Sequence, residues 1–492
     1  QEITLSSTVN GSNSTSLILD RPASALLSPG NFYSVLFLED GVLTSDLTAH
    51  YLTANSNLEV NDTVYVVVAD LHKNTHWKST GVIDSLLLNN GGYDLTLDPG
   101  VFLNINATII SNGDCNHLVG INSSVFGQQA NIGIASGPLT IDYVQISNII
   151  ANSTITANNS IDAGNNLGWT INSPASRNLF WIGGSGNWSD AAHWSLSSGG
   201  SAASCIPSAV DNVIVDSNSG LASGTMTVDL SNAAVHNIDL SNAGPGIVLT
   251  GENLQVMGSM SLASGMDWQL TTLTLSPQSG TSQITSSGTR FFDVVVNGSG
   301  TISLNDEWYG RTLDIQSGSF DLNGQDLSTS VITSATGTNF ISGAVTITVA
   351  NFYLQGSISN SSSTDFICKH LPVPYNVNNL FLFRTSGTYR DITVMESGLS
   401  FLNTDVNCRV ITAYGDFSYA GYASVDTVQK MVAFGNLTTG SLVIDTLFLN
   451  NPGKTTNMVS SLTIGSELIA NGTPAFPILL QGSTFAVLNK AS

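Results

Sequence analysis

Short apolar segments rich in β-branched residues recur along the whole chain, and each is bounded by Asn, Gly or Ser. Examples are VYVVVADL at 64–71, FFDVVV at 291–296 and AVTITVANFYL at 344–354. Such residues pack well on a pleated surface, whereas Asn and Gly accept the positive φ angles of tight turns. No segment shows the three-turn apolar stripe of an amphipathic helix. The pattern therefore predicts an all-β chain.

The charge of the chain limits its partners. Asp and Glu outnumber Lys and Arg by 35 to 13 in 492 residues, which gives a formal net charge of −22. Such a polyanion repels nucleic acid and anionic lipid, and no run of about 18 apolar residues occurs, so we expect no nucleic-acid partner and no membrane insertion. In saline outside a cell, salt would screen the charge and Ca²⁺ could bridge carboxylates.

Two short sequences recur almost unchanged far along the chain. VIDSLLLNN at 82–90 recurs as VIDTLFLNN at 443–451, and ISNG at 110–113 recurs as IANG at 469–472. The offset is 361 residues for the first pair and 359 for the second. A period near 360 residues indicates one full repeat and the start of the next, as in a segment cut from a longer tandem-repeat protein.

The composition changes between Asp162 and Trp194, where Gly and Trp replace the alternating strands. We interpret this stretch as a junction and place a boundary near residue 175. The predicted domains are a β-helix unit at 1–175, truncated on its N-terminal side, a β-rich unit at 176–442, and the start of the next copy at 443–492.

Two all-β architectures fit these strands, a stack of parallel coils and a series of antiparallel sandwiches. Sandwich strands usually alternate apolar and polar residues, whereas residues 86–88 (LLL) and 66–68 (VVV) are apolar in succession. TVDLSNA at 227–233 is echoed by NIDLSNA at 237–243, and short echoes are typical of stacked coils. We favour a parallel β-helix, or β-solenoid, with tandem β-sandwiches as the alternative.

The four cysteines lie far apart, at 115, 205, 368 and 408. No CxxC pair occurs, which excludes a zinc ribbon or a thioredoxin-type site. Two disulfides are compatible with the spacing, and Cys368–Cys408 is the pairing we favour. Buried free thiols are the equal alternative.

A tryptophan-rich motif, FWIGGSGNWSDAAHWS, occupies residues 180–195. Trp181, Trp188 and Trp194 could cover the open end of a solenoid core, where apolar surface would otherwise meet water. Exposed sugar-stacking rings are the alternative, and we favour the cover because large aromatic side chains are usually buried. The rest of the motif would shape the backbone, with Gly183, Gly184 and Gly186 at bends and Asn187 or Asp190 as a cap.

This motif, followed by CIPSAVDNVIVDSNSG at 205–220, resembles a motif of giant gliding-adhesin-like surface proteins of the Bacteroidota, exported by the type IX secretion system. The preceding SIDAGNNLGW at 160–169 resembles the closing coil of pectate-lyase-like right-handed β-helix units found in the same proteins. The resemblance implies secretion, surface display and large size. The signal peptide and C-terminal sorting domain expected of the group are not in this sequence.

The sequence contains no complete catalytic motif of those considered. Gly-x-Ser-x-Gly does not occur, and His72 and His76, four residues apart beside a strand, fit a surface loop better than a metal site. Asp306 and Glu307 are adjacent, and adjacent residues of a strand point to opposite faces, so this pair alone cannot form a glycosidase site. We therefore predict no enzymatic activity.

These features predict a stiff, extracellular module of a cell-surface fibre or adhesin, built from coils whose backbone hydrogen bonds and apolar core are continuous. Its partners would be other copies of itself, in a homo-oligomer or filament, or surface glycans and cell surfaces. The alternative is a carbohydrate-binding or polysaccharide-degrading β-helix module, which would present an exposed aromatic row near paired carboxylates.

Overall fold

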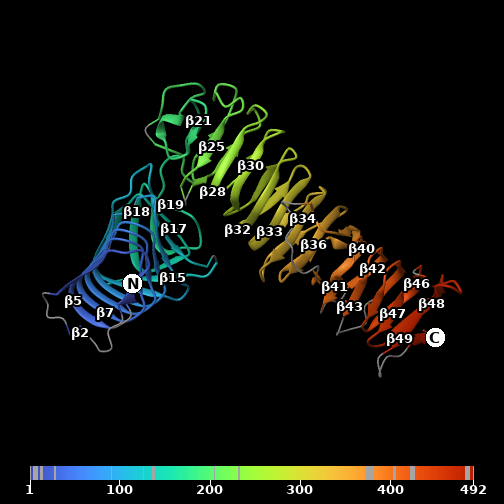
Figure 1. Ribbon diagram of the computed structural model, residues 1–492. Helices are drawn as coiled ribbons and strands as arrows, with labels where there is room; N and C mark the ends of the chain where they lie inside the picture. Colours follow the sequence, from blue (N-terminus) through green and yellow to red (C-terminus); the bar gives the residue numbers. More distant parts are fainter. Residues whose placement is uncertain are drawn as a thin grey trace. The chain divides into compact units, whose positions relative to one another are not determined.

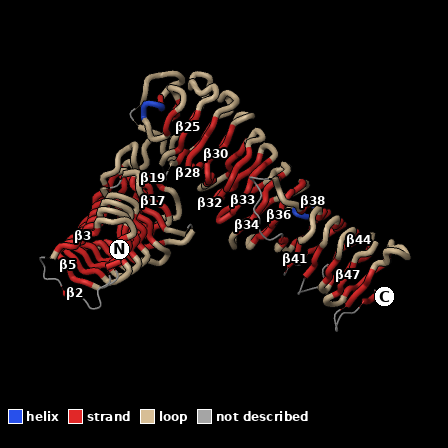
Figure 2. Tube along the Cα trace, in the orientation of Figure 1, coloured by secondary structure: helices blue, strands red, loops and turns tan. Residues whose placement is uncertain are grey.

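The computed structural model describes most of the chain, and every structural statement below concerns these residues: 2–3, 9–10, 15–26, 29–89, 91–125, 127–135, 139–203, 205–230, 233–372, 382–402, 406–420, 427–450, 452–482 and 488–490. They form fifty strands and two short 3-10 helices, with no α-helix (Figure 2). The strands stack in parallel as a β-solenoid of about 22 turns, which confirms the predicted fold class and excludes tandem antiparallel sandwiches. No described helix could span a lipid bilayer.

The chain forms two compact units, residues 1–238 with 252–257 and residues 239–251 with 258–492. Figure 1 shows the strands of each unit as successive rungs. The solenoid of the first unit has two sheets. One has nine strands: β1 (Glu2–Ile3), β4 (Ser24–Leu26), β6 (Gly41–Leu43), β8 (Leu58–Val60), β10 (Thr75–Trp77), β12 (Asp94–Leu97), β14 (Val119–Ser123), β17 (Val144–Ser147) and β19 (Ile161–Asp162). The other has eleven: β2 (Val9–Asn10), β3 (Ser16–Leu19), β5 (Gly30–Phe37), β7 (Leu47–Ala54), β9 (Val64–Leu71), β11 (Gly81–Leu88), β13 (Phe102–Ser111), β15 (Ala130–Ile134), β16 (Leu139–Asp142), β18 (Ile149–Asn158) and β20 (Leu167–Asn172).

The coils of the first unit repeat every 17 residues between β5 and β11. Val35, Leu52, Ala69 and Leu86 lie opposite one another on successive strands, and all four are fully buried. Each of these eight-residue strands buries its first, third, sixth and eighth residues, because two adjacent outward-facing residues interrupt the alternation at its centre. One apolar row per inward position therefore runs through the coils, and each row keeps water from the hydrogen bonds between coils.

A further set of strands follows residue 177. It comprises β21 (Asn178–Trp181), β22 (Gly186–Asn187), the 3-10 helix η1 (Ala191–His193), β23 (Trp194–Ser195), β24 (Asn212–Ile214), β25 (Thr225–Val228), β26 (Ala234–Val235), β27 (Asn237–Asp239) and β28 (Val248–Val256). β21 pairs with β23 in antiparallel fashion and with β24 in parallel. The antiparallel hairpin therefore marks a break from the regular coils.

The second unit continues as parallel strands in chain order, in which β34 pairs with β36 and β40 with β42. Its elements are β29 (Met260–Ser261), β30 (Asp267–Leu275), β31 (Thr281–Thr285), β32 (Arg290–Leu304), β33 (Trp308–Asp321), β34 (Leu327–Ser334), β35 (Asn339–Ile341), β36 (Thr346–Leu354), β37 (Ser357–Ser359), η2 (Ser361–Ser363), β38 (Asp365–Cys368), β39 (Leu382–Phe383), β40 (Gly387–Val394), β41 (Leu399–Leu402), β42 (Val406–Ala413), β43 (Phe417–Ala420), β44 (Thr427–Ala433), β45 (Leu437–Thr439), β46 (Leu442–Leu449), β47 (Thr455–Met458), β48 (Leu462–Ala470), β49 (Leu479–Gly482) and β50 (Leu488–Lys490).

A continuous series of aromatic side chains forms part of the core of the second unit over many coils. Neighbouring rings along this series lie 4.5 to 6.2 Å apart, centroid to centroid, and every ring is buried. Edge-to-face and offset pairs at these distances add to the gain from apolar burial. The series is Trp268, Phe291, Trp308, Phe320, Phe340, Phe352, Phe366 and Tyr389.

The long sequence repeat is also a repeat of structural detail. The pairing of β11 with β13 shifts register between Ile83 and Ser85, and that of β46 with β48 shifts between Ile444 and Thr446, 361 residues later. Just after these strands, the side chain of Asn112 donates a hydrogen bond to Asn89, and Asn471 donates to Asn450. The last Asn of each NN pair, at 90 and 451, lies outside the described residues.

The predicted Cys368–Cys408 disulfide is wrong, because the structure contains a Cys115–Cys205 disulfide and leaves the other two cysteines as buried free thiols. On β40, which lies between their strands, Cys368 faces Val394 whereas Cys408 faces Tyr389. Two strand spacings and five residues of offset put their Cα atoms well over 10 Å apart, and a disulfide needs less than about 7 Å. Burial raises the pKa of the Cys368 thiol to about 12.

Thiol titration checks this pairing. In denaturant without reductant, we expect two reactive thiols per chain, at Cys368 and Cys408, and after reduction four. Without denaturant the two thiols should react far more slowly, because both are buried and out of reach of the reagent. Peptide mapping of the labelled sites would contradict the pairing if Cys115 carried label in the unreduced chain.

Candidate functional site

The three tryptophans of the sequence motif form one closed cluster. Trp181, Trp188 and Trp194 are each 0% exposed. The Trp194 ring meets the other two edge-on, with centroids 4.9 Å and 4.8 Å away, and its Nε1 donates to the backbone oxygen of Trp188. This burial excludes the alternative of a sugar-stacking platform, because no ring face is open to solvent.

The glycines of the motif serve two purposes. Gly183 and Gly184 have φ angles of +84° and +80°, so they supply the predicted bends. Gly186 does not bend the chain; a methyl group there would lie 2.0 Å from the His193 ring, so glycine is needed for space. The cap is Asp190, whose side chain accepts a hydrogen bond from the backbone N–H of Ala192, while Asn187 is exposed.

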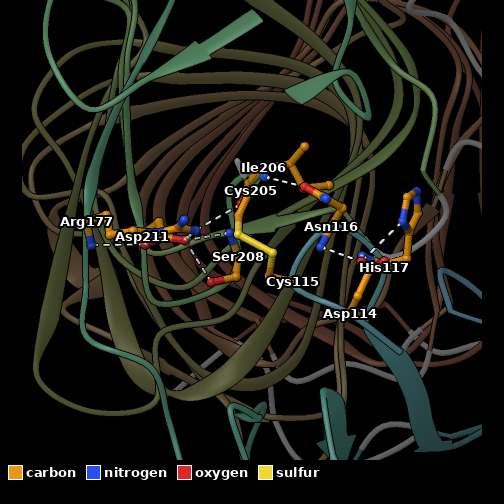
Figure 3. The surroundings of a disulfide bond; sticks show 9 residues. All are labelled: Asp114, Cys115, Asn116, His117, Arg177, Cys205, Ile206, Ser208 and Asp211. Carbon is orange, nitrogen blue, oxygen red and sulfur yellow. Dashed lines mark hydrogen bonds and ion pairs between the residues drawn. A yellow bond between two sulfur atoms is a disulfide. The ribbon is translucent and has the colours of Figure 1, made fainter. Parts of the chain in front are cut away.

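A disulfide joins the first solenoid to the segment that follows the tryptophan cluster (Figure 3). Cys115 lies in the turn between β13 and β14, and Cys205 lies 90 residues later, with 5.5 Å between their Cα atoms. Asp114 shapes that turn by accepting hydrogen bonds from the backbone N–H groups of Asn116 and His117. Beside the disulfide, the Ile206 N–H donates to Oδ1 of Asn116 over 3.0 Å.

A buried ion pair lies next to this disulfide. The Asp211 side chain is 0% exposed, and its carboxylate accepts from Nε and Nη2 of Arg177 at 3.0 and 2.7 Å. It also accepts from the backbone N–H of Arg177 and from both the N–H and the hydroxyl of Ser208. Every lone-pair direction of this buried charge therefore faces a donor, which is the condition for such a charge to be tolerated.

A small apolar cluster completes the connection. Ile161 of β19 packs with Ala209, Ala234 and Met257, and Leu118 and Val210 pack against this group. We name the disulfide, the Arg177–Asp211 pair and this cluster together the joint. The first solenoid and the tryptophan-rich segment are thus connected covalently and by apolar burial. The ion pair holds Arg177, at the end of the connecting residues 173–177, on the segment that follows.

The joint is not predicted from the sequence, although its residues lie at the predicted boundary and in the segment that follows the tryptophan motif. Arg177 lies in SPASRN at the predicted boundary, and Cys205 and Asp211 lie in the CIPSAVDN segment. Cys115 and Cys205 lie on either side of that boundary, and this placement indicates a disulfide across the junction. Closeness in sequence instead favoured the wrong pair, Cys368 and Cys408.

The other polar groups considered from the sequence do not assemble into a site. Asp306 accepts hydrogen bonds from Ser286 and Ser287, whereas Arg311 pairs with Asp293 on another coil. His72 and His76 pair separately with Asp70 and Asp98, at 3.1 and 2.7 Å. Across the described residues, no three His, Cys, Asp or Glu side chains gather as they would around a metal ion, so nothing there singles out a Ca²⁺ site.

A groove of about 670 Å³ runs over five coils of the nine-stranded sheet. One wall is a row at the corner where each strand begins, with Ala23, Asp40, Asn57, Asn74 and Asp94 aligned by the pairing of the following residues. The other wall is the outward position two residues further along, where Val42, Glu59, His76 and Thr96 lie opposite one another. We name this feature the carboxylate groove.

The carboxylates of the groove differ in environment. A hydrogen bond from Ser56 lowers the pKa of Asp40, and one from Lys78 lowers the pKa of Glu59. Burial raises the pKa of Asp94 to about 6, opposed only by a hydrogen bond from Asn122. Among the described residues, Asp94 Oδ1 has no hydrogen-bond partner, and it lies so close to Gly120 that a methyl group there would be 1.8 Å away.

Asp94 should make stability depend on pH. Its folded pKa exceeds the unfolded value of 3.8, so the folded state binds the proton more tightly and stability falls as pH rises from about 4 to about 6. A shift of this size corresponds to at most about 3 kcal/mol. We expect Asp94→Asn to leave the opening free energy of β12 and β14 unchanged at pH 4 and to raise it by about 1–3 kcal/mol at pH 8, measured by hydrogen exchange with mass spectrometry.

Asp98, the residue directly after the same strand, provides the matched control. Hydrogen bonds from Ser124 and His76 outweigh burial and lower its pKa, so its carboxylate stabilises the fold above about pH 4. Asp98→Asn should therefore weaken protection at pH 8. Equal effects of the two substitutions would refute the assignment of Asp94 as an uncompensated charge.

Comparison of the chain with protein-family models, curated proteins and solved structures gives no match.

Proposed function

We propose that the chain is a stiff mechanical module of an extracellular fibre or adhesin. The joint is the observation that carries this proposal. A connection that only had to link two folded parts could be a flexible linker, whereas this one combines a disulfide, an apolar cluster and an ion pair whose carboxylate is fully buried. Such a connection transmits force and orientation from one part of the chain to the next.

The coils themselves support the same function. Each additional coil adds about 4.8 Å of length and buries its apolar rows against its neighbours, so length grows without a new kind of contact. The aromatic series of the second unit extends this core from Trp268 to Tyr389. A protein built this way resists extension because many hydrogen bonds must break together.

The Cys115–Cys205 disulfide supports the extracellular part of the proposal. Disulfides persist in secreted and surface proteins and are rare in reducing compartments. The resemblance of residues 180–195 to gliding-adhesin-like proteins points the same way, and display on a bacterial surface by type IX secretion belongs to the proposal. Partners would be further copies of the chain or a target surface.

Single-molecule extension tests the mechanical function. Pulling the chain from its ends in oxidising buffer, we expect distinct force peaks for both units, and a final contour length about 300 Å shorter than in reducing buffer. The difference arises because the disulfide hides the 90 residues between Cys115 and Cys205 from the extension. Extension without resolved peaks in either buffer would contradict a mechanical module.

Carbohydrate binding is the second candidate function, and one exposed aromatic group favours it. Tyr33 and Tyr51 are 41% and 37% exposed, and they surround His50 with centroids 5.6 and 4.5 Å from its ring. Tyr65 on the next strand is 50% exposed. A glycan array separates the functions: binding that is lost in Tyr51→Ala would favour the carbohydrate function, and no binding would favour the mechanical one.

A further inference from the structure

We propose that a polar pocket of the second unit binds an acidic saccharide, by holding one sugar residue that carries a carboxylate or a sulfate group. The pocket has a volume of about 650 Å³ and is lined by two stretches of the chain, within residues 354–362 and 384–388. Its volume lies in the range of about 300–1,000 Å³ that is usual for small-molecule sites. The proposal goes beyond the mechanical function, because neither the joint nor the aromatic series lines this pocket.

The path of the backbone creates the hollow. β33, β35 and β37 pair in parallel, and Phe320, Phe340 and Ile358 lie opposite one another on them. The stretch that faces them across the pocket, residues 384–386, has no strand structure. Ile358 is accordingly only half-buried, whereas the two phenylalanines are buried. Its side chain offers an apolar contact to the C–H groups of a sugar ring.

Arg384 gives the pocket its charge. It is the one charged residue among the described residues that line the pocket. No ion pair or side-chain hydrogen bond holds its guanidinium within the described part of the chain, whereas Arg390 and Arg409 each pair with an Asp of a neighbouring strand. The Tyr353 ring lies 5.9 Å from its Cζ, a contact that uses none of its N–H groups. A guanidinium with free N–H groups can hold a carboxylate or sulfate through two parallel hydrogen bonds.

Neutral polar side chains complete the lining. Residues 360–362 (Asn-Ser-Ser) and Thr388 line the pocket, and their side chains make no hydrogen bond to any other described residue. Elsewhere in this unit, such side chains bond from coil to coil, as Asn407 does when it accepts from the backbone N–H of Thr427. Hydroxyl and amide groups both donate and accept hydrogen bonds, as the hydroxyl groups of a sugar do. The pocket therefore combines one cation for an acidic group with several partners for the sugar that carries it.

The experiment titrates the full chain with trigalacturonate, with a sulfated carrageenan tetrasaccharide and with neutral maltotriose, each followed by calorimetry. Salt is kept at about 0.15 M, so that the net charge of −22 is screened beyond about 8 Å. We expect at least one of the two acidic oligosaccharides to bind at a single site, about tenfold or more tightly than maltotriose. Arg384→Gln should weaken that binding by about tenfold or more, because a bidentate contact between two charges is lost.

Controls separate a saccharide site from general attraction to an arginine. Arg409→Gln removes an exposed arginine that is already paired with Asp391, and it should leave binding unchanged. Ser362→Val with Thr388→Val should weaken oligosaccharide binding about fivefold and leave the binding of inorganic sulfate as it is. Absence of binding by both acidic oligosaccharides would overturn the proposal, as would equal weakening by Arg409→Gln and Arg384→Gln, or inorganic sulfate that binds as tightly as the oligosaccharide. Hydrogen exchange of β36 and β40 checks that each variant stays folded.

Discussion

Asp211→Ala should destabilise the joint by about 3–5 kcal/mol, the largest effect of any single substitution discussed. The carboxylate is fully buried and accepts from Arg177 and Ser208, so its removal leaves the guanidinium of Arg177 without its counter-ion and the backbone N–H groups of Arg177 and Ser208 without this acceptor. Hydrogen exchange of residues 206–214 measures the effect directly, because these amides are released when the joint opens.

An exposed ion pair of the same residue types serves as the control. In the Asp391–Arg409 pair the arginine side chain is 58% exposed, and exposed pairs contribute little to stability because water screens them. Asp391→Ala should therefore leave the hydrogen exchange of its own strand nearly unchanged. A similar, small effect at both sites would show that the Arg177–Asp211 pair is an ordinary surface contact.

Loss of the disulfide should have the second largest effect. In the chain-entropy account, a cross-link that closes a loop of 90 residues restricts the unfolded chain by about 4.6 kcal/mol, and native disulfides typically contribute about 2–4 kcal/mol overall. We expect the double variant Cys115→Ser with Cys205→Ser to lower the free energy of opening of the joint by that amount. Proteolysis near residue 177 should then become faster, because the segment between the two parts is freed.

Reductant provides the control for this prediction. It should bring the wild-type chain to the behaviour of the double variant and leave the double variant unchanged, since the cysteines that remain are free. The hydrogen exchange of β40 and β42 in the second unit should stay the same in all four conditions. A response of the double variant to reductant would mean that the effect does not come from the Cys115–Cys205 bond.

The all-β nature of the chain and the parallel stack could be predicted from local sequence. β-branched runs and Asn-Gly turns act within a few residues, so their signal does not depend on the rest of the chain. Apolar residues in succession do not mark a strand buried on both faces here: Leu86 and Leu88 are fully buried, but Leu87 faces outward and is half-buried. Successive apolar residues occur in these strands because some outward-facing apolar side chains are also partly buried.

The coil period was present in the sequence but was not recognised. Val35, Leu52, Ala69 and Leu86 stand 17 residues apart and form one buried row. The ten-residue echo, in contrast, is no coil period, because Asn212 and Asn237, which share a side-chain hydrogen bond across neighbouring coils, are 25 residues apart. Strand starts and turns use the same few residue types along the whole chain. The distance between two short echoes therefore need not equal the length of a coil.

Strand and turn chemistry is local, so the amino-acid sequence alone is enough to predict the elements. The long repeat is likewise visible in the sequence, down to a register shift that recurs 361 residues later. The cysteine pairing, the burial of Asp211 and the alignment of Asp40 with Asp94 arise only in the folded chain. These contacts depend on how many residues each coil takes and on where a stack ends, and small differences in coil length add up over many coils before two distant loops meet.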